Sequence, residues 1–444
     1  MLNTLISELR RAPVLDDPGR ILQAHSVERR FLVIAALFLL VNTLSLWILR
    51  GDVADFWHGL AWGACAVFGH LVLNWRLPDR DPLLFPLAMF MAGWGIIAIS
   101  RLQPPFADRQ SIWLIVALCG MLAISWTRAL LRLMRAFRYL LLFGGLAVLA
   151  VTIQVGINPS DPEGVFGAPA LWIALGSLYI QPSEGLKIIL VVFLASYLAE
   201  QYPTLRAEGL HTGRGRITVS PRILGPIALM WGLCVVVLVW QRDLGTAALF
   251  FIVFLVLLYT ATGYTFIVYS GVLMLGAVGV IAYQLFAVVR LRIDIWWNPW
   301  LEAEGRAYQI VQSLMAFAAG GVFGQGIGQG APGFIPVVHS DFMYAALAEE
   351  WGLIGALAVL VCLAVFSTRG IRIAIGQRGK PYQTLLAVGL STLIAAQSLL
   401  IMGGVLKLIP LTGVTLPFFS YGGSSLVVTF LITGLLLRLS AREV

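Results

Sequence analysis

The stretch "FMYAALAEEWGLIGALAVLVCLAVF", residues 342–366, is apolar almost throughout and carries two adjacent acids, Glu349 and Glu350. A helix of about 17 to 25 apolar residues crosses a hydrocarbon layer of about 30 Å. The stretch is therefore long enough to span a membrane. An unpaired charge inside a span is costly, so the two glutamates need partners. Asp341 stands directly before the stretch.

The composition of the whole chain extends this prediction. Hydrophobic residues make up 59% of the sequence, charged residues 12%, and the mean hydropathy is +0.89. These values are typical of a polytopic, all-α integral membrane protein and exclude a soluble domain. About twelve transmembrane helices are predicted, at 31–49, 56–75, 83–100, 111–126, 139–156, 184–199, 223–240, 244–261, 264–287, 342–366, 382–406 and 421–437. The shorter apolar stretch 168–180 fits a half-span or re-entrant segment.

The distribution of positive residues predicts the orientation. Lys and Arg near the ends of spans are retained in the cytoplasm, and most of the 30 positive residues lie in alternate connections. The largest blocks are 10–30, 128–138, 206–222 and 369–380. Both termini are therefore expected in the cytoplasm, with the protein in the cytoplasmic membrane among membrane lipids. Orientation also explains the net charge of +8, so no nucleic acid is expected as a partner.

Metal and phosphate motifs give little signal. The four cysteines lie in apolar runs, and the five histidines are scattered without metal-ligand spacing, so no metal site is predicted. The acids present still allow transient binding of a divalent cation, Mg²⁺ or Mn²⁺. The segment "GGVFGQGIGQG", 320–330, matches neither common phosphate-binding pattern. It is expected to be a flexible or tightly packed loop near the membrane surface.

One predicted outer connection, 288–341, is much longer than the others. Long loops in compact folds are usually functional or disordered, and this one is too rich in Trp, Ile and Val for disorder. Within it, 307–321 has apolar residues at helical spacing around Gln309, Gln312 and Ser313. This pattern predicts a helix at the membrane surface.

Charged residues on the outer side are candidates for function because each is costly near a membrane interior. Glu184 and Lys187 stand three residues apart and can form an ion pair on one helix face. Asp243 is either the N-cap of the following span or part of a site, and Arg242 precedes it. Lys407 either extends to the membrane surface or contributes to the site.

The acids around the opening stretch have two interpretations each. Asp341 is either a first-turn residue stabilised by the helix dipole or a reactive carboxylate. Glu349 and Glu350 lie about 12 Å further along the helix at 1.5 Å per residue. For these two, pairing with another helix is favoured over a catalytic role.

Five motifs together resemble the SEDS family, the FtsW/RodA/SpoVE group of bacterial peptidoglycan glycosyltransferases. They are "IQPSEGLK", "QRDLGTA", "AYQIVQSLMAFAAGGVFGQGIG", "HSDFMYAALAEEWGLIGAL" and "PLTGVTLPFFSYGGSS", in the family's order. The resemblance implies a ten-helix core at 83–438 that includes the loop 288–341. Outside this core are a tail at 1–30, two extra helices in 31–82 and a tail at 439–444. The family's "QPDLG" departs here, since Arg242 replaces the proline.

The resemblance implies an enzyme that polymerises lipid II on the outer face of the membrane. The 4-hydroxyl of one disaccharide attacks the anomeric carbon of another, giving a β-1,4 glycan strand and undecaprenyl pyrophosphate. Asp341 matches the family's essential carboxylate. Family members work with a class B penicillin-binding protein, a transpeptidase. A lipid II flippase or transporter and a non-catalytic scaffold are the alternatives.

The residues fit this chemistry. Asp341 is suited to accept the hydroxyl proton as general base, although a helix N-terminus would lower its pKa and weaken it as a base. Cations stabilise a departing pyrophosphate. Candidates for substrate binding are Lys187, Arg242, Arg290, Arg292, Arg306, Gln312, His339, Lys407 and Ser420. Glu184, Asp243, Glu349 and Glu350 are expected to support the structure.

Overall fold

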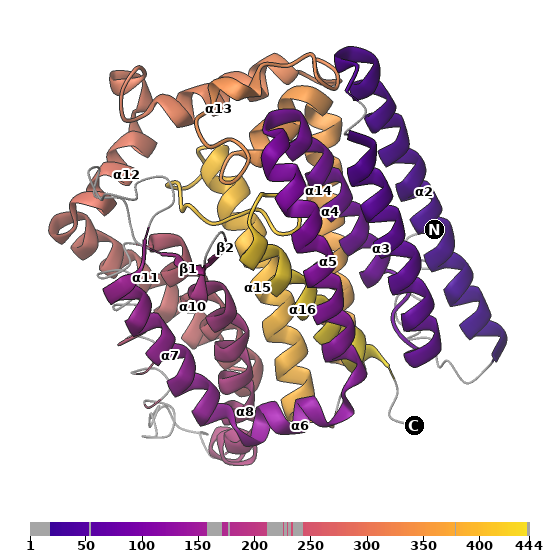
Figure 1. Cartoon of the computed structure of the whole chain (residues 1–444). Coiled ribbons are helices and arrows are strands. Elements are labelled where there is room, and N and C mark those ends of the chain that lie inside the picture. The colour runs from indigo at the N-terminus through magenta and orange to yellow at the C-terminus, as the bar shows by residue number, and fades with distance from the viewer. Residues whose placement is uncertain are drawn as a thin grey trace, which may run out of the picture.

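The computed structural model describes residues 18–52, 55–157, 171–175, 178–210, 225, 229, 232–233, 243–377 and 379–441. In this part of the chain, eleven helices are long and apolar enough to cross a membrane, and they form one bundle (Figure 1). The protein is therefore an integral membrane protein, as predicted. These helices match eleven of the twelve predicted spans, and the twelfth, 223–240, lies almost entirely outside the described residues.

The spanning helices follow the apolar stretches closely. Their bounds are α2 (Pro18–Arg50), α3 (Asp55–Arg76), α4 (Leu84–Leu102), α5 (Pro104–Trp126), α7 (Arg138–Val155), α8 (Pro182–Leu210), α10 (Leu244–Thr262), α11 (Thr265–Leu285), α14 (Met343–Gly376), α15 (Pro381–Val405) and α16 (Gly423–Ser440). α2 begins well before residue 31, so part of the predicted tail 1–30 is helical. Hydropathy locates the apolar part of a helix, whereas backbone hydrogen bonds continue into polar sequence.

Shorter elements lie at the two ends of the bundle. They are α6 (Arg128–Ala136), α12 (Ala287–Trp297), η1 (Pro299–Glu302), α13 (Tyr308–Gly320) and η2 (Pro332–Phe334). α13 confirms the helix predicted at 307–321. Figure 1 places α13 at one end of the bundle, and α6 with the C-terminus at the other.

The half-span predicted for 168–180 is wrong. Its described residues include β1 (Ile173–Leu175) and β2 (Leu178–Ile180), which pair antiparallel with Ile173 opposite Ile180. Two three-residue strands satisfy their backbone groups by pairing with each other and are too short to cross a membrane. Composition alone did not distinguish this short apolar hairpin from a helical segment.

The two helices that precede the predicted ten-helix core are part of the bundle. α2 packs against α3 and α4, and α3 packs against α4 and α5. As a result α4 is enclosed: 89% of its most apolar stretch is buried, compared with 11% for α11 at the periphery. The hydrophobic core includes side chains of α2, α3 and α5 as well as those of α4, α8, α10, α14, α15 and α16.

The glycine-rich loop packs tightly against an interruption in α14. Gly352 has φ 67° and ψ −164°, which breaks the helix. The freed carbonyls of Glu349 and Glu350 accept hydrogen bonds from the amides of Gln325 and Gly326, at 2.9 and 3.1 Å. A Cβ atom at Gly324 would lie 2.2 Å from the Glu350 carbonyl oxygen. Only glycine permits this approach, which confirms the tightly packed alternative.

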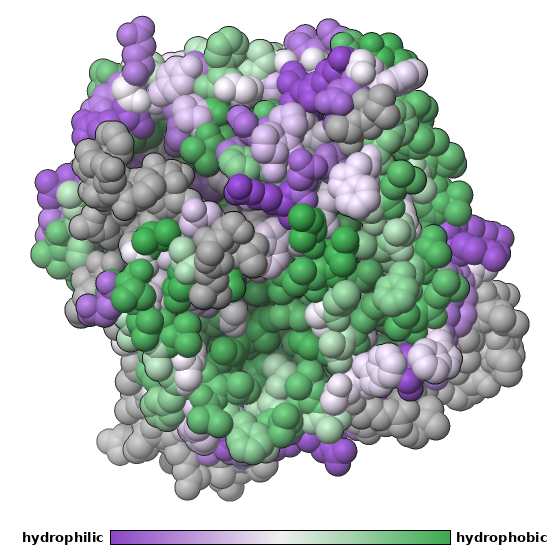
Figure 2. Space-filling model, viewed as in Figure 1, coloured by the Kyte–Doolittle hydropathy of each residue, from purple (hydrophilic) through white to green (hydrophobic). Residues whose placement is uncertain are grey.

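The surface fits a membrane environment. Figure 2 shows a band of apolar side chains between hydrophilic residues at the two ends of the bundle. The apolar surface is hollowed between the regions where Figure 1 places α7 and α5. This hollow lies below the hydrophilic end that carries α13.

Candidate functional site

Asp341 lies in the turn before α14, outside the helix. The helix begins at Met343 with Phe342 as its N-cap, and its first turn contains no acid. The interpretation of Asp341 as a first-turn residue is therefore wrong. Its side chain is half-buried, and one carboxylate oxygen accepts a hydrogen bond of 3.0 Å from the Ser340 hydroxyl.

The surroundings of Asp341 make it a stronger base than an ordinary aspartate. Burial raises the pKa of Asp341, and the nearby charge of Asp243 raises it further. The Ser340 hydrogen bond and the positive charge of Arg292 act in the opposite direction, but the net direction is upward. This net rise is opposite to the lowering expected at a helix N-terminus, because loss of hydration is the largest influence on this carboxylate.

Arg292 is a predicted cation that the structure brings beside Asp341. From α12, its Nη1 atom donates to the carbonyl of Thr412 at 3.0 Å. A Cβ atom at Gly413 would lie 3.5 Å from Arg292 Nη2 and 3.9 Å from Asp341 Oδ2, so both side chains border the same glycine. Burial lowers the pKa of Arg292, while the charges of Asp243 and Asp341 raise it.

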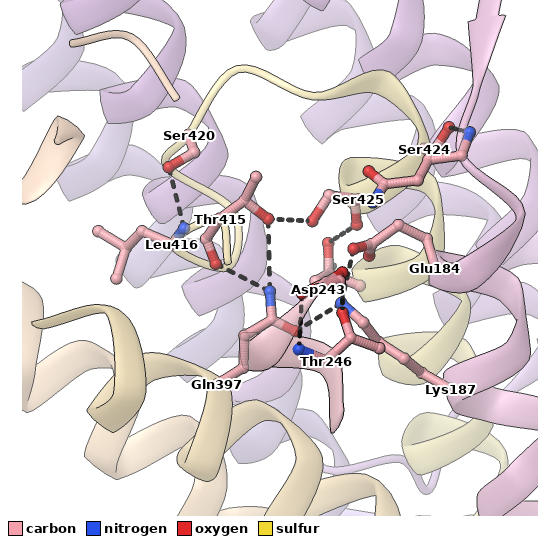
Figure 3. Close-up of polar contacts among 12 residues, drawn as sticks. Glu184, Lys187, Asp243, Thr246, Gln397, Thr415, Leu416, Ser420, Ser424 and Ser425 are labelled. Atoms are coloured by element: carbon pink, nitrogen blue, oxygen red, sulfur yellow. Dashed lines mark hydrogen bonds and ion pairs between the residues drawn. The ribbon is translucent and has the colours of Figure 1, made fainter. Parts of the chain in front are cut away.

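Lys187 belongs to a closed polar cluster in the bundle (Figure 3). Its Nζ atom donates to Glu184 Oε1 at 2.6 Å and to Gln397 Oε1 at 3.0 Å. The amide nitrogen of Gln397 in turn donates to the carbonyl of Thr415 at 2.8 Å. Lys187 is 1% exposed and Glu184 5% exposed. The predicted Glu184–Lys187 pair is confirmed, and Lys187 donates to two acceptors inside this cluster.

The loop between α15 and α16 connects this cluster to the segment that contains Asp341. Thr415 shares a hydrogen bond of 2.8 Å with Ser425 at the start of α16. Ser420 accepts from the amide of Leu416 at 2.9 Å and donates to the carbonyl of Ser340, the residue before Asp341. Ser420 is buried, and both hydrogen bonds hold one loop against another. Ser420 therefore stabilises the contact between these two loops.

Asp243 has two roles in the geometry. Its carboxylate accepts from the amide and hydroxyl of Thr246, at 2.9 and 2.6 Å, and caps α10. The predicted N-cap is confirmed. Its negative charge also acts on Asp341 and Arg292, so it belongs to the electrostatic surroundings of the site. Arg242 lies outside the described residues.

The two glutamates of α14 hold the glycine-rich loop. Glu350 pairs with Arg101 of α4, with 3.1 Å between Arg101 Nε and Glu350 Oε1, and accepts from the Gly328 amide at 3.2 Å. Pairing with another helix is confirmed for Glu350. Glu349 instead accepts from the Ala331 amide at 2.7 Å, so its partner is the loop backbone.

Other predicted cations are engaged away from Asp341. Arg290 donates to the carbonyls of Tyr283 and Gln284, and Arg306 forms an exposed ion pair with Glu302. Lys407 adopts a left-handed backbone conformation with φ 59°, and its carbonyl accepts from the indole of Trp296 at 3.1 Å. These residues lie at the same end of the bundle as Asp341 and α13 (Figure 1), without contacting Asp341 in any hydrogen bond or ion pair of the described chain.

Gln312 and His339, two predicted substrate-binding residues, lie in different parts of the structure. Gln312 lines a cavity of about 160 Å³ between α13 and η2, together with Phe334 and Glu349. His339 packs between Phe106 and Tyr421, with ring centroids 4.7 and 5.6 Å away. Burial lowers the pKa of His339, which favours a neutral ring in an aromatic cluster.

Three residues that organise the site were not predicted from the sequence: Arg101, Gln110 and Gln397. Gln110 joins α5 to the loop before α16 through the carbonyl of Ser420 and the amide of Gly422, at 3.3 and 3.2 Å. Gln397 was detectable as a polar residue in the middle of an apolar run. Within the described residues, no group of three or more His, Cys, Asp or Glu is arranged to hold a metal ion.

The chain is similar in sequence to known proteins of one family. Residues 83–444 match the FtsW/RodA/SpoVE family of cell cycle proteins. The peptidoglycan glycosyltransferase RodA of Mycobacterium tuberculosis (strain ATCC 25618 / H37Rv) is 36% identical over 394 residues, covering 86% of this chain and 82% of that protein. The probable peptidoglycan glycosyltransferase FtsW of Geobacter sulfurreducens (strain ATCC 51573 / DSM 12127 / PCA) is 33% identical, covering 81% and 92%.

Solved structures share the fold. A chain from a peptidoglycan synthase complex that coordinates polymerization and crosslinking superposes with a TM-score of 0.65 at 26% identity, covering 81% of this chain and 97% of that one. The rod shape determining protein RodA of Thermus thermophilus superposes with a TM-score of 0.55 at 24% identity, covering 81% and 96%.

Proposed function

The chain belongs to the FtsW/RodA/SpoVE family and is a peptidoglycan glycosyltransferase, and we propose that Asp341 is the general base of its reaction. The observation that carries this proposal is a half-buried carboxylate with a raised pKa, beside a guanidinium, at one end of a membrane bundle. The proposed substrate is lipid II, a disaccharide held on undecaprenyl pyrophosphate, which acts as both donor and acceptor.

The proton transfer follows from the position of Asp341. The 4-hydroxyl of the acceptor sugar attacks the anomeric carbon of the donor, and its proton passes to the carboxylate of Asp341 as the new C–O bond forms. The Ser340 hydroxyl donates to one carboxylate oxygen, which leaves the other to receive the proton. Its raised pKa increases the driving force for the transfer.

The departing group needs positive charge. The bond from the anomeric carbon to the pyrophosphate oxygen breaks, and undecaprenyl pyrophosphate leaves with the electron pair. Arg292 is the proposed partner of this pyrophosphate, because it borders the same glycine as Asp341 and a guanidinium binds two phosphate oxygens at once. Arg242, Arg290, Arg306 and Lys407 are proposed as further contacts for the pyrophosphate.

A direct displacement with inversion at the anomeric carbon fits these residues. Asp341 is placed here as a base, and no Ser or Cys nucleophile with a His base is evident around it in the described chain. The polyprenyl chain of the substrate is expected to lie in the apolar hollow between α7 and α5 (Figure 2). The hollow adjoins the hydrophilic end at which the sugars would react.

The partner and the orientation are part of the same proposal. The solved chain with a TM-score of 0.65 comes from a complex that couples polymerization to crosslinking. By analogy, this chain would supply glycan strands to a class B penicillin-binding protein, a transpeptidase. With both termini in the cytoplasm, Asp341 faces the outer side of the membrane, where crosslinking occurs.

Reconstitution with fluorescent lipid II tests the proposal. Vesicles containing the purified native chain are expected to form glycan polymer on gels, whereas Asp341→Asn is expected to form almost none. Asp294→Asn is the matched control because it removes the same charge from an exposed position on α12. Movement of lipid II between leaflets without polymer would instead identify a flippase. Normal growth of cells that carry only Asp341→Asn would identify a scaffold.

A further inference from the structure

We propose that a basic pocket at the end of the bundle opposite α13 binds the phosphate-bearing headgroup of an anionic phospholipid. The pocket has a volume of about 270 Å³ and is formed by α6, α8 and the start of α15. Its lining consists of Leu131, Arg132 and Arg135 of α6, Ala199 of α8, and residues 380–383. Figure 1 shows α6 lying across this end of the bundle, far from α13.

The lining is strongly positive. It contains Arg132, Arg135 and Lys380 and no acid. Arg132 and Arg135 stand three residues apart on α6, so they project from the same side of the helix. Their neighbour Arg138 is neutralised, since its guanidinium donates to both carboxylate oxygens of Glu200 at 2.5 and 2.7 Å. In the described chain neither Arg132 nor Arg135 forms an ion pair with an acid.

The remaining lining groups also favour an anion. α15 begins at Pro381 without a side-chain cap, so its first amides and the positive end of its dipole face this region. Tyr382 lines the pocket with its side chain 7% exposed. The guanidinium carbon of Arg135 lies 5.4 Å from the Tyr382 ring centroid. A phosphate between α6 and α15 would complement these groups.

The setting of the pocket identifies a lipid as the source of the phosphate. α6 joins two spanning helices and carries arginines on one side, while Leu133 on α6 and Phe137 directly after it are exposed. A short helix of this kind lies in the plane of the interface, where headgroups meet acyl chains. The positive residues of α6 predict the cytoplasmic leaflet, which is rich in anionic lipids. Acyl chains would cover the exposed apolar side chains, which a soluble phosphate cannot do.

Lipid binding by the purified full-length chain tests the proposal. Native mass spectrometry would follow retention of phosphatidylglycerol and of phosphatidylcholine by the native chain and by Arg132→Gln/Arg135→Gln. The matched control is Arg29→Gln/Arg30→Gln, because both arginines are exposed on α2 and the loss of charge is equal. Preferential retention of phosphatidylglycerol by the native chain is expected. Its affinity should fall about 25-fold in the pocket variant, at about a factor of five per arginine near a surface, and little in the control.

Three results would overturn the proposal. They are equal loss of phosphatidylglycerol in the pocket and control variants, equal retention of the two lipids, and displacement of the lipid by millimolar inorganic phosphate. The last would identify a site for a soluble anion. Thermal unfolding in micelles of neutral detergent checks that the pocket variant is folded, and its polymerisation activity there is expected to match that of the native chain.

Discussion

Two regions of the molecule each bring one carboxylate near one cation, but in different surroundings. One holds Glu184 and Lys187, and the other holds Asp341 and Arg292. In the first, the charged atoms are 2.6 Å apart and both side chains are buried. In the second, Asp341 is half-buried and accepts from Ser340, while Arg292 donates to the carbonyl of Thr412. The first combination is closed, whereas the second leaves charged atoms available to a substrate.

Desolvation explains the difference. Buried charges are tolerated when they pair closely and their remaining hydrogen-bonding groups are satisfied. Gln397 completes the partners of Lys187, so that pair acts as part of the core. Asp341 loses hydration without a direct ion pair, and its pKa rises as a result. Charge in a membrane protein therefore indicates function most strongly where the pairing is incomplete.

The largest expected effect is a loss of polymerisation activity on substitution of Asp341, without the loss of stability expected on substitution of Glu184. Asp341→Asn should lower the rate of polymer formation by about 10²–10⁴-fold, the usual contribution of a general base, while its thermal unfolding stays close to that of the native chain. Rates on gels and unfolding in the same detergent measure both quantities. A large loss of thermal stability in this variant would make Asp341 a structural residue, like Glu184.

Glu184→Gln should instead lower the stability of the protein. It leaves Lys187 buried with its charge uncompensated, which is expected to lower the free energy of unfolding by about 3–5 kcal/mol. Chemical denaturation in detergent measures the loss. The double variant Glu184→Gln/Lys187→Met should recover part of this stability because it removes both charges. If the single variant is as stable as the native chain, the Glu184–Lys187 pair does not stabilise the core.

Arg292→Gln should shift the pH dependence of activity. Asp341 acts as a base only when ionised, so activity is lost as the pH falls through its pKa. Arg292 lowers that pKa, and removing its charge should therefore move the acidic limb of the rate profile upward, by about one pH unit. Rates measured across the acidic range test this, with Arg290→Gln as the control. An unchanged limb would place Arg292 outside the electrostatic surroundings of Asp341.

Arg306→Gln is expected to have the smallest effect. Its ion pair with Glu302 is exposed, and exposed pairs contribute little to stability. Thermal unfolding should be indistinguishable from that of the native chain, and polymer formation should change less than in Arg292→Gln. A loss of activity as large as that of Arg292→Gln would show that Arg306 is as important as Arg292 for binding the pyrophosphate, and would contradict its place among the minor contacts.

The individual helices and several local contacts were predictable because they depend on residues close in sequence. Long apolar runs located the spans, helical spacing located α13, and a spacing of three residues predicted the pairing of Glu184 with Lys187. The position of Asp243 before an apolar run likewise predicted the cap of α10. Motif order placed Asp341 at the centre of the proposed chemistry.

Contacts between distant segments were decided only by the tertiary structure. Arg292 and Asp341 border Gly413, Gln397 completes the partners of Lys187, and Arg101 pairs with Glu350. The direction of the pKa shift of Asp341 also belongs here, because burial outweighs the nearby positive charge only once the surrounding loops are in place. Hydropathy and spacing act along the chain, whereas desolvation and charge pairing depend on which helices and loops lie beside one another.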